Sequence, residues 1–305
     1  MFMGMISLSV TITSLALTYF RYSNGVRRLP FLFRCFDVMS QIVTIFIVVR
    51  SRERIRKLLQ DLLEPLCQQQ LSSLRQFSMT YILLMIISSC IHLLLVINHL
   101  IVVKANMYHI VLDAFLFYNR MTDWFMSSIF TYVFVVKLIQ ITEDNYFTQV
   151  GEQVCTTPSK MIAIHRRAMV CLREELLSSF SLIPCLWFAN VFIHAAASIV
   201  TFFELDHLHK LNSIIVRVSG LFYLIFACES CASHTEAKTE ELITRMLVND
   251  TMDSQASFVA ELRHKPGVTF NVWSLFKIRS NLILSFVSAL ITFTVLFVQL
   301  AHQVP

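Results

Sequence analysis

Seven long apolar runs dominate this chain of 305 residues. They cover about residues 1–20, 30–49, 78–103, 111–136, 178–203, 211–233 and 280–302. A helix needs about 20 mostly apolar residues to cross the hydrocarbon core of a bilayer. The runs therefore predict an all-α, polytopic membrane protein, with a single domain of seven transmembrane helices over residues 1–305.

The composition excludes several other classes of protein. Apolar residues make up 56% of the chain and charged residues 15%, against roughly 45–50% and about 25% in an average soluble domain. The mean hydropathy is +0.64. These values argue against a disordered chain and against a soluble enzyme of ordinary surface chemistry. The net charge of +5 is small for this length, so no nucleic-acid partner is expected.

The distribution of basic residues predicts how the chain sits in the membrane. The three long polar stretches, 50–77, 137–177 and 234–279, hold 17 of the 25 Lys and Arg residues, while the three short ones hold 5. Because Lys and Arg gather on the cytosolic side, we expect the long stretches and the N-terminus inside and the C-terminus outside. The first run alone favours the opposite orientation, since three arginines follow it closely.

The long inner stretches carry helical periodicity. In residues 55–63 the apolar positions recur every three or four residues, as in an amphipathic helix. We therefore expect residues 50–77, 137–177 and 234–279 to form a cytosolic helical layer below the transmembrane helices. Residues 50–57, taken alone, are equally compatible with a basic surface that rests on anionic lipid.

Ionisable residues in the fourth run allow two interpretations. Arg120 and Asp123 are three residues apart and so share one helix face. Charged groups at this depth usually face a partner, the bundle interior or water. They form either a structural ion pair or the polar floor of an outward-facing ligand pocket. The candidate pocket residues are Tyr108, Asp113, Tyr118, Arg120, Asp123, Trp124, Asn190, His194 and Arg217.

The last run, 280–302, carries a stripe of mostly small polar residues. Its members are spaced three or four apart and lie on one face of a helix: Ser285, Ser288, Thr292, Val295 and Gln299. Such a stripe can pack against a neighbouring helix, with Ser and Thr bonding to their own backbone carbonyls. It can equally line a water-filled path for ions. The residues themselves leave both interpretations open.

A short motif in this run resembles a known signature. Thr292-Phe293, five residues, then Gln299-Leu300 is similar to the end of the last helix in the arthropod gustatory receptor family: Thr-Tyr, five mostly apolar residues, Gln-Phe. Residues 272–284 also resemble that family's entry into the helix. Phe293 and Leu300 depart from the motif, which indicates a divergent member. The expected topology matches along nearly the whole chain, and the residue-level likeness covers roughly the last 40 positions.

The resemblance implies a ligand-gated, non-selective cation channel built from four identical or related subunits. A small-molecule tastant would bind from outside, and the channel would lie in the plasma membrane of sensory neurons. Leu296, Gln299 and Leu300 would form the outer gate of a central pore, above Thr292 and the serines of the stripe. Such a protein is not an enzyme and needs no cofactor or metal.

The alternatives to a channel are a G-protein-coupled receptor and, second, a carrier or a membrane-embedded enzyme. A seven-helix G-protein-coupled receptor requires an outside N-terminus and normally an outer-loop disulfide, but the predicted outer loops contain no cysteine. A carrier normally shows internal repeats or interrupted helices, and neither is evident. A membrane-embedded enzyme needs an acid–base or metal cluster. The candidates Glu204, Asp206, His207 and His209 fall on a short outer loop, where a solvated role is the simpler interpretation.

The orientation gives a first prediction. An epitope tag at the C-terminus should be stained by antibody on intact cells, whereas an N-terminal tag should be stained only after permeabilisation, because the basic loops hold the N-terminus inside. Immunofluorescence of the two tagged chains checks this. The reverse pattern would favour the G-protein-coupled receptor.

Overall fold

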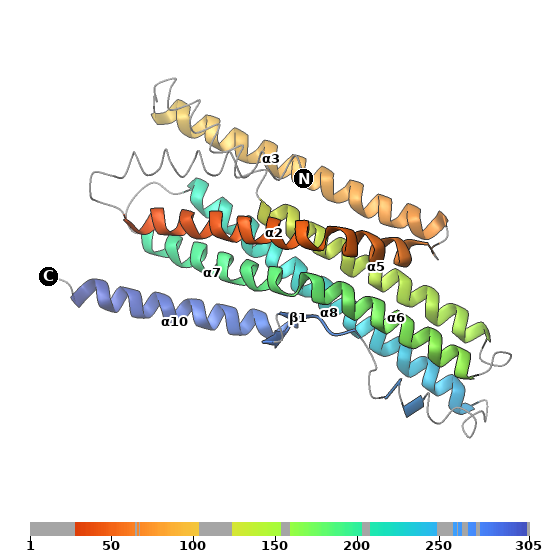
Figure 1. Ribbon diagram of the computed structural model, residues 1–305. Coiled ribbons are helices and arrows are strands. Elements are labelled where there is room, and N and C mark those ends of the chain that lie inside the picture. Colours follow the sequence, from red (N-terminus) through yellow and green to blue (C-terminus); the bar gives the residue numbers. More distant parts are fainter. Residues whose placement is uncertain are drawn as a thin grey trace.

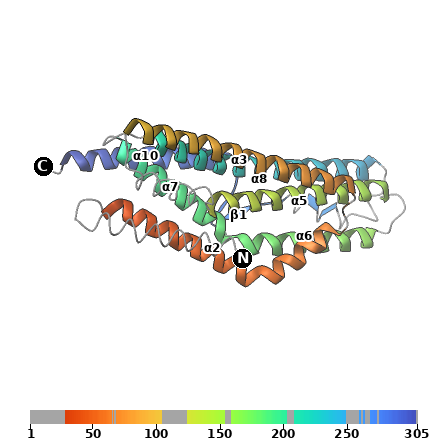
Figure 2. The same ribbon diagram turned by 90° about the horizontal axis from the view of Figure 1, so that it is seen from above.

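The structure, a computed structural model, describes residues 28–64, 66, 68–103, 124–153, 159–202, 208–248, 259–260, 262–263, 268–272 and 275–303. These form long helices that run along one common axis (Figure 1), and the view from above shows the same elongated bundle (Figure 2). The helices are α2 (Arg28–Leu63), α3 (Gln68–Val103), α5 (Trp124–Gln153), α6 (Ser159–Phe180), α7 (Leu182–Phe202), α8 (Leu208–Val248) and α10 (Asn281–Gln303). The predicted all-α class is confirmed.

A short hairpin is the one sheet of the described residues. Strands β1 (Asn271–Val272) and β2 (Phe276–Lys277) pair antiparallel, with Val272 opposite Phe276. The hairpin lies directly before α10 in the chain, so it sets where that helix begins.

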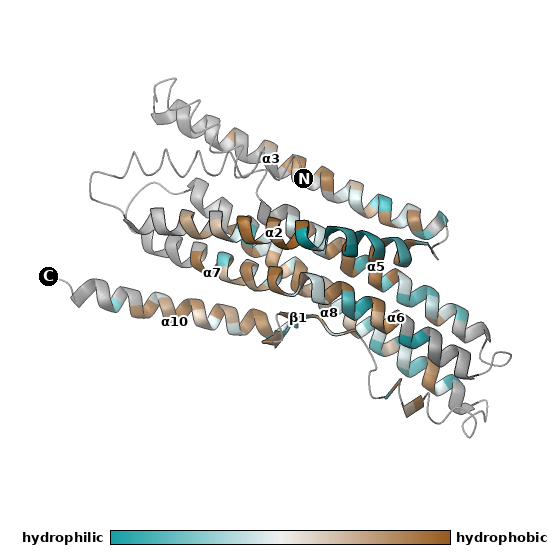
Figure 3. Cartoon of the chain, in the orientation of Figure 1, coloured by the Kyte–Doolittle hydropathy of each residue, from teal (hydrophilic) through white to brown (hydrophobic). Residues whose placement is uncertain are grey.

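Several helices are much longer than a bilayer requires. α2 and α3 each have 36 residues and α8 has 41, against about 20 for a span. α2 continues without a break from the apolar run 30–49 into the basic stretch that follows. Figure 3 shows the result: apolar residues gather in the half of the bundle with α7 and α10, and hydrophilic residues gather in the half with α6.

The amphipathic pattern in 55–63 matches the burial in α2. Ile55, Leu58 and Leu62 are buried in the main hydrophobic core, and Leu59 and Leu63 are half-buried against it. The polar residues between them are turned outward, as a period of 3.6 residues requires. The first run, 1–20, and residues 111–123 of the fourth run lie outside the described residues.

The fifth apolar run differs from the expectation of one straight helix over 178–203. The chain breaks at Ser181, and the flanking parts, Met169–Phe180 and Leu182–Ile193, meet at 41°. Pro184 explains the break, because its ring clashes with the carbonyl four residues earlier, at Phe180. The backbone N–H and the hydroxyl of Ser181 both donate to the carbonyl of Ser178, at 3.3 and 2.9 Å, and close the end of α6.

A helix that crosses a membrane must be both long enough and apolar enough. Among the described residues no single helix satisfies both requirements, and the bent pair Met169–Phe180 and Leu182–Ile193 satisfies them together.

The core is centred on the contact between α5 and α8, closed by α7. Trp187 and Tyr132 are almost fully buried, and their rings meet edge to face with centroids 5.5 Å apart. The indole Nε1–H of Trp187 donates to Ser128 Oγ at 2.7 Å. Because this bond pairs the indole N–H, the large aromatic side chain is buried without an unpaired donor.

A buried charge cluster joins α5 to α6. The carboxylate of Glu143 accepts from Arg166 and, at 2.9 Å, from Arg173. All three side chains are at most 5% exposed. The guanidinium carbon of Arg166 also lies 5.4 Å from the ring centroid of Tyr146 and 5.3 Å from that of Phe147. Burial lowers the pKa of Arg173, and the charge of Glu143 opposes that shift.

The cluster generates a stability prediction. Glu143→Ala should destabilise the protein by about 3–5 kcal/mol, because it leaves two buried guanidinium groups without their counter-charge. Thermal unfolding of the detergent-solubilised protein measures the effect.

Glu241→Ala is the matched control. Glu241 also accepts from two cations, Lys238 and Arg245, at 3.2 and 2.6 Å, but its side chain is 45% exposed. Water replaces these bonds when they are lost, so the unfolding midpoint should hardly move. Equal midpoints for the two variants would contradict a structural role for the buried cluster.

Candidate functional site

Among the described residues, α10 packs on its own chain through one face. Half-buried residues on that face include Ile283, Phe286 and Leu290. Phe192 of α7 meets Phe286 and Phe293 edge to face, with ring centroids 6.0 and 5.8 Å apart. Between Phe286 and Phe293 the packing partner of α10 is therefore α7, and Figure 1 shows the two helices side by side.

Most of the polar stripe predicted from the sequence lies on the opposite face of α10, while Ser285, at the edge of the stripe, also borders the space between α10 and α7. Residues two apart on an α-helix point in nearly opposite directions, because about 3.6 residues make a turn. Ser288 and Thr292 thus point away from α7, while Phe286 and Leu290 point toward it. All members of the stripe are exposed: Ser285, Ser288, Thr292, Val295 and Gln299.

Apolar side chains border the stripe. Leu284 and Ile291 lie on one side of it and Leu296 on the other, and these three are 75%, 59% and 54% exposed. The helix thus offers a narrow polar strip between two apolar flanks. Exposed apolar side chains of this kind pack against lipid or against other helices, whereas the polar strip can be hydrated.

Two hydroxyl groups of the stripe donate within α10. Thr292 Oγ1 donates to the carbonyl of Ser288 at 2.9 Å, and Ser285 Oγ donates to that of Asn281 at 3.2 Å. These are the bonds expected for Ser and Thr on an apolar helix. They satisfy the donors without a second helix and leave oxygen lone pairs turned outward.

Polar contacts tie the base of α10 to α8. Ser280 Oγ donates to Glu229 Oε1 at 2.9 Å, and the guanidinium of Arg279 lies 3.5 Å from Glu236. Before the hairpin, the backbone N–H of Val268 donates to Thr235 Oγ1 at 3.0 Å. Together these contacts, here called the α8 latch, hold the chain entering α10 against about two turns of α8. Nothing in the sequence pattern indicated them.

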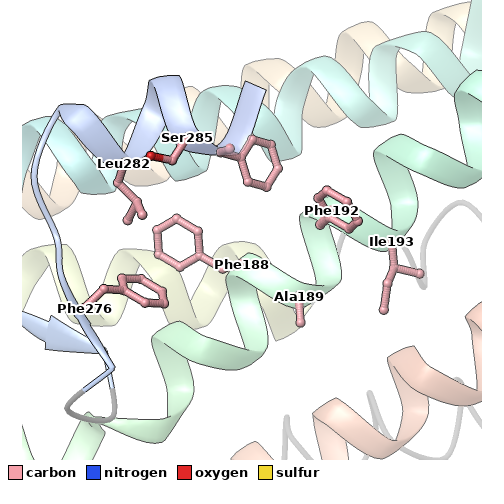
Figure 4. A pocket seen from close by; sticks show the side chains of 8 residues that line it. Phe188, Ala189, Phe192, Ile193, Phe276, Leu282 and Ser285 are labelled. Atoms are coloured by element: carbon pink, nitrogen blue, oxygen red, sulfur yellow. The ribbon is translucent and has the colours of Figure 1, made fainter. Parts of the chain in front are cut away.

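An apolar cavity of about 450 Å³ lies between α7 and α10 (Figure 4). Its lining is almost wholly hydrocarbon and consists of Phe188, Ala189, Phe192, Ile193, Phe276, Leu282, Ser285 and Phe286. Sequence analysis missed it. The available signal was the spacing of Phe188 and Phe192, four residues apart, which places both rings on one face of α7.

The predicted ligand-pocket residues are only partly described. The structure brings Asn190 of α7 and Arg217 of α8 together: Arg217 Nη1 donates to Asn190 Oδ1 at 2.6 Å, and both are buried. Tyr108, Asp113, Tyr118, Arg120 and Asp123 lie outside the described residues, as do Glu204, Asp206 and His207. Trp124, His194, His209 and Leu300 belong to helices, but their side chains are outside the described part.

Comparisons with known proteins address the fold. No protein-family model and no curated protein matches the chain. Among solved structures it is similar to the insect olfactory receptor OR5 from Machilis hrabei, with a TM-score of 0.63 and 12% identity, covering 98% of this chain and 87% of that one. The complex of OR5 with eugenol matches with a TM-score of 0.50, 14% identity and the same coverage. Both are receptors and not enzymes. The chain thus has the predicted fold of a polytopic membrane protein.

The buried Asn190–Arg217 contact generates a prediction. Asn190→Ala should lower the free energy of unfolding by about 1–3 kcal/mol, because it removes a buried acceptor from a guanidinium. Asn190→Asp keeps an oxygen in the same place and adds a counter-charge, so it should unfold closer to wild type. Thermal unfolding in detergent checks both variants. An Asn190→Asp variant less stable than Asn190→Ala would contradict the contact.

Proposed function

We propose that this chain is a subunit of a chemosensory, ligand-gated cation channel in which α10 from each of four subunits lines a central pore. The observation that carries the proposal is the orientation of the polar stripe of α10. Four of its five members, all except Ser285, face away from α7, to which the helix is packed, and they lie between two exposed apolar flanks. Four such helices around an axis would turn their stripes toward water and pack their flanks against one another.

The fold likeness supports the same assignment. The similar structures are an olfactory receptor alone and in complex with eugenol, so a small organic ligand fits this chain as well. The gustatory motif, Thr292-Phe293 and Gln299-Leu300, favours a tastant. In this proposal the channel lies in the plasma membrane of sensory neurons, alone or with related subunits, and the inner parts of the helices hold the tetramer together.

The residues of α10 take distinct roles in the proposed pore. Gln299 and its apolar neighbours Leu296 and Leu300 would narrow the outer end. Val295 and Thr292 would line the path beneath them, followed by the two serines of the stripe. Hydroxyl and amide oxygens can replace part of the hydration shell of a cation without a fixed charge, which suits non-selective conduction.

The α8 latch offers a route from ligand to pore. Arg217, which contacts Asn190, and the latch residues Glu229 and Glu236 all belong to the unbroken helix α8. At about 1.5 Å per residue, Arg217 and Glu236 are roughly 28 Å apart along it. A ligand that binds the open arrangement more tightly would shift α8, and the latch would carry that shift to the base of α10.

Whole-cell recording tests the proposal. Cells expressing the chain, alone and with related subunits, are exposed to a panel of tastants and to eugenol. A ligand-evoked cation current that depends on this chain is expected. Surface expression without current under any subunit combination would overturn the channel assignment.

Cysteine accessibility generates the sharpest prediction about α10. In the conducting channel, Thr292→Cys and Gln299→Cys should be modified by a water-soluble thiol reagent and the current reduced, because both side chains face the pore. Leu290→Cys, two residues from Thr292 and turned toward α7, is the matched control and should not react. Wild-type chain corrects for its eight native cysteines. Reaction at position 290 without reaction at 292 would remove the stripe from the pore.

A further inference from the structure

The second half of α2 carries a run of basic residues, 50–57, here called the basic segment. It contains Arg50, Arg52, Arg54, Arg56 and Lys57 and one acidic residue, Glu53. The proposed channel function does not use these residues.

The cations of the basic segment are exposed, and most lack an ion pair. Arg54 Nε lies 2.7 Å from Glu175 Oε1 of α6. Within the described part of the chain the structure gives Arg50, Arg52, Arg56 and Lys57 no acidic partner, although Glu53 is close in sequence. Four positive charges are therefore left to solvent or to a ligand outside the chain.

The basic segment is held rigidly. It lies in the middle of α2, whose buried residues Ile55, Leu58 and Leu62 anchor this part of the helix in the core. The cations of the basic segment are thus held on a helix and not on a flexible loop. Because folding has already ordered this helix, binding a ligand there costs little further backbone conformational entropy.

The position of the basic segment along α2 indicates what it meets. The turn before it carries exposed apolar side chains, with Phe46, Val48 and Val49 between 42% and 61% exposed. In a polytopic membrane protein such side chains face lipid tails. Residues 50–57 rise about 12 Å along the helix, so they pass through the adjoining headgroup layer, which is several Å thick.

We propose that the basic segment binds the phosphate groups of anionic phospholipids in the cytosolic leaflet. The charge is complementary, since phosphates replace the carboxylates that these side chains lack in the fold. Arginine suits the role because its planar guanidinium can bind two phosphate oxygens at once. Clusters of Lys and Arg directly below a membrane span attract anionic lipid in this way, and salt weakens the attraction.

Lipid retention by the full chain tests the proposal. The chain is purified from a detergent solution containing equal amounts of phosphatidylserine and phosphatidylcholine, and the retained lipids are quantified by mass spectrometry. Wild type should be enriched in phosphatidylserine, and the enrichment should fall as salt is raised. The variant Arg50→Gln/Lys57→Gln should reduce it by roughly fivefold or more, given the attraction of each cation to an anionic surface. Phosphatidylcholine retention should not change.

The chain offers a matched control in α8. Lys238→Gln/Arg245→Gln removes the same two residue types at the same seven-residue spacing, but these cations already contact Glu241. This variant should keep the wild-type enrichment. Thermal unfolding of each variant separates lost lipid binding from misfolding, and the salt titration of wild type stands even if one variant fails to fold.

The outcomes are decisive in either direction. Equal enrichment in the two double variants, or no enrichment in wild type, would overturn the proposal and leave the basic segment as a determinant of orientation only. The experiment needs no current and no tastant, so its result is independent of the channel assignment.

Discussion

Within the described part of the chain, α10 is contacted along one face, and its remaining surface is left to lipid, water or another subunit. This geometric constraint governs α10, where Phe286 and Leu290 pack toward α7 and the other faces are left outward. Because about 3.6 residues make a turn, four of the five stripe residues then face away from α7. The hydroxyls of Ser285 and Thr292 donate to the helix backbone. A face of this kind can be hydrated and needs no hydrogen-bonding partner from a second helix.

Three sets of charged residues in the fold lie in different environments, and the environment decides what each set does. Glu143 is buried with two arginines and fastens α5 to α6. Glu229 and Glu236 lie at the surface of α8 and hold the segment entering α10. The basic segment of α2 has almost no partner within the described chain. Burial makes the first set structural, whereas exposure leaves the other two able to exchange partners.

The apolar pattern was sufficient to predict the all-α class and several helix bounds. The predicted run 280–302 corresponds to α10 over Asn281–Gln303, and the predicted run 78–103 lies within α3. The break at Ser181 was missed because hydropathy continues across it, although Pro184 carried the signal. Hydropathy thus locates the apolar part of each helix, but it does not show where the helix continues into a polar stretch or breaks.

The site was less predictable, for a physical reason. Spacing along α10 predicts that the stripe residues share one face, but only packing against Phe192 determines which direction that face points. Asn190 and Arg217 were proposed as members of one pocket on polarity alone, and their 2.6 Å contact depends on the rotation of two helices. The α8 latch joins residues about 30 to 50 positions apart, a separation over which local patterns carry no information.

The cavity between α7 and α10 has a mechanical consequence. Closely packed interiors resist displacement, because any movement forces atoms to overlap. The open pocket of about 450 Å³ beside Leu282 and Phe286 removes part of that resistance at the start of α10. The rings of Phe286 and Phe293 against Phe192 still hold the helix to α7. Side chains that border the pocket can therefore change rotamer without displacing the helix backbone.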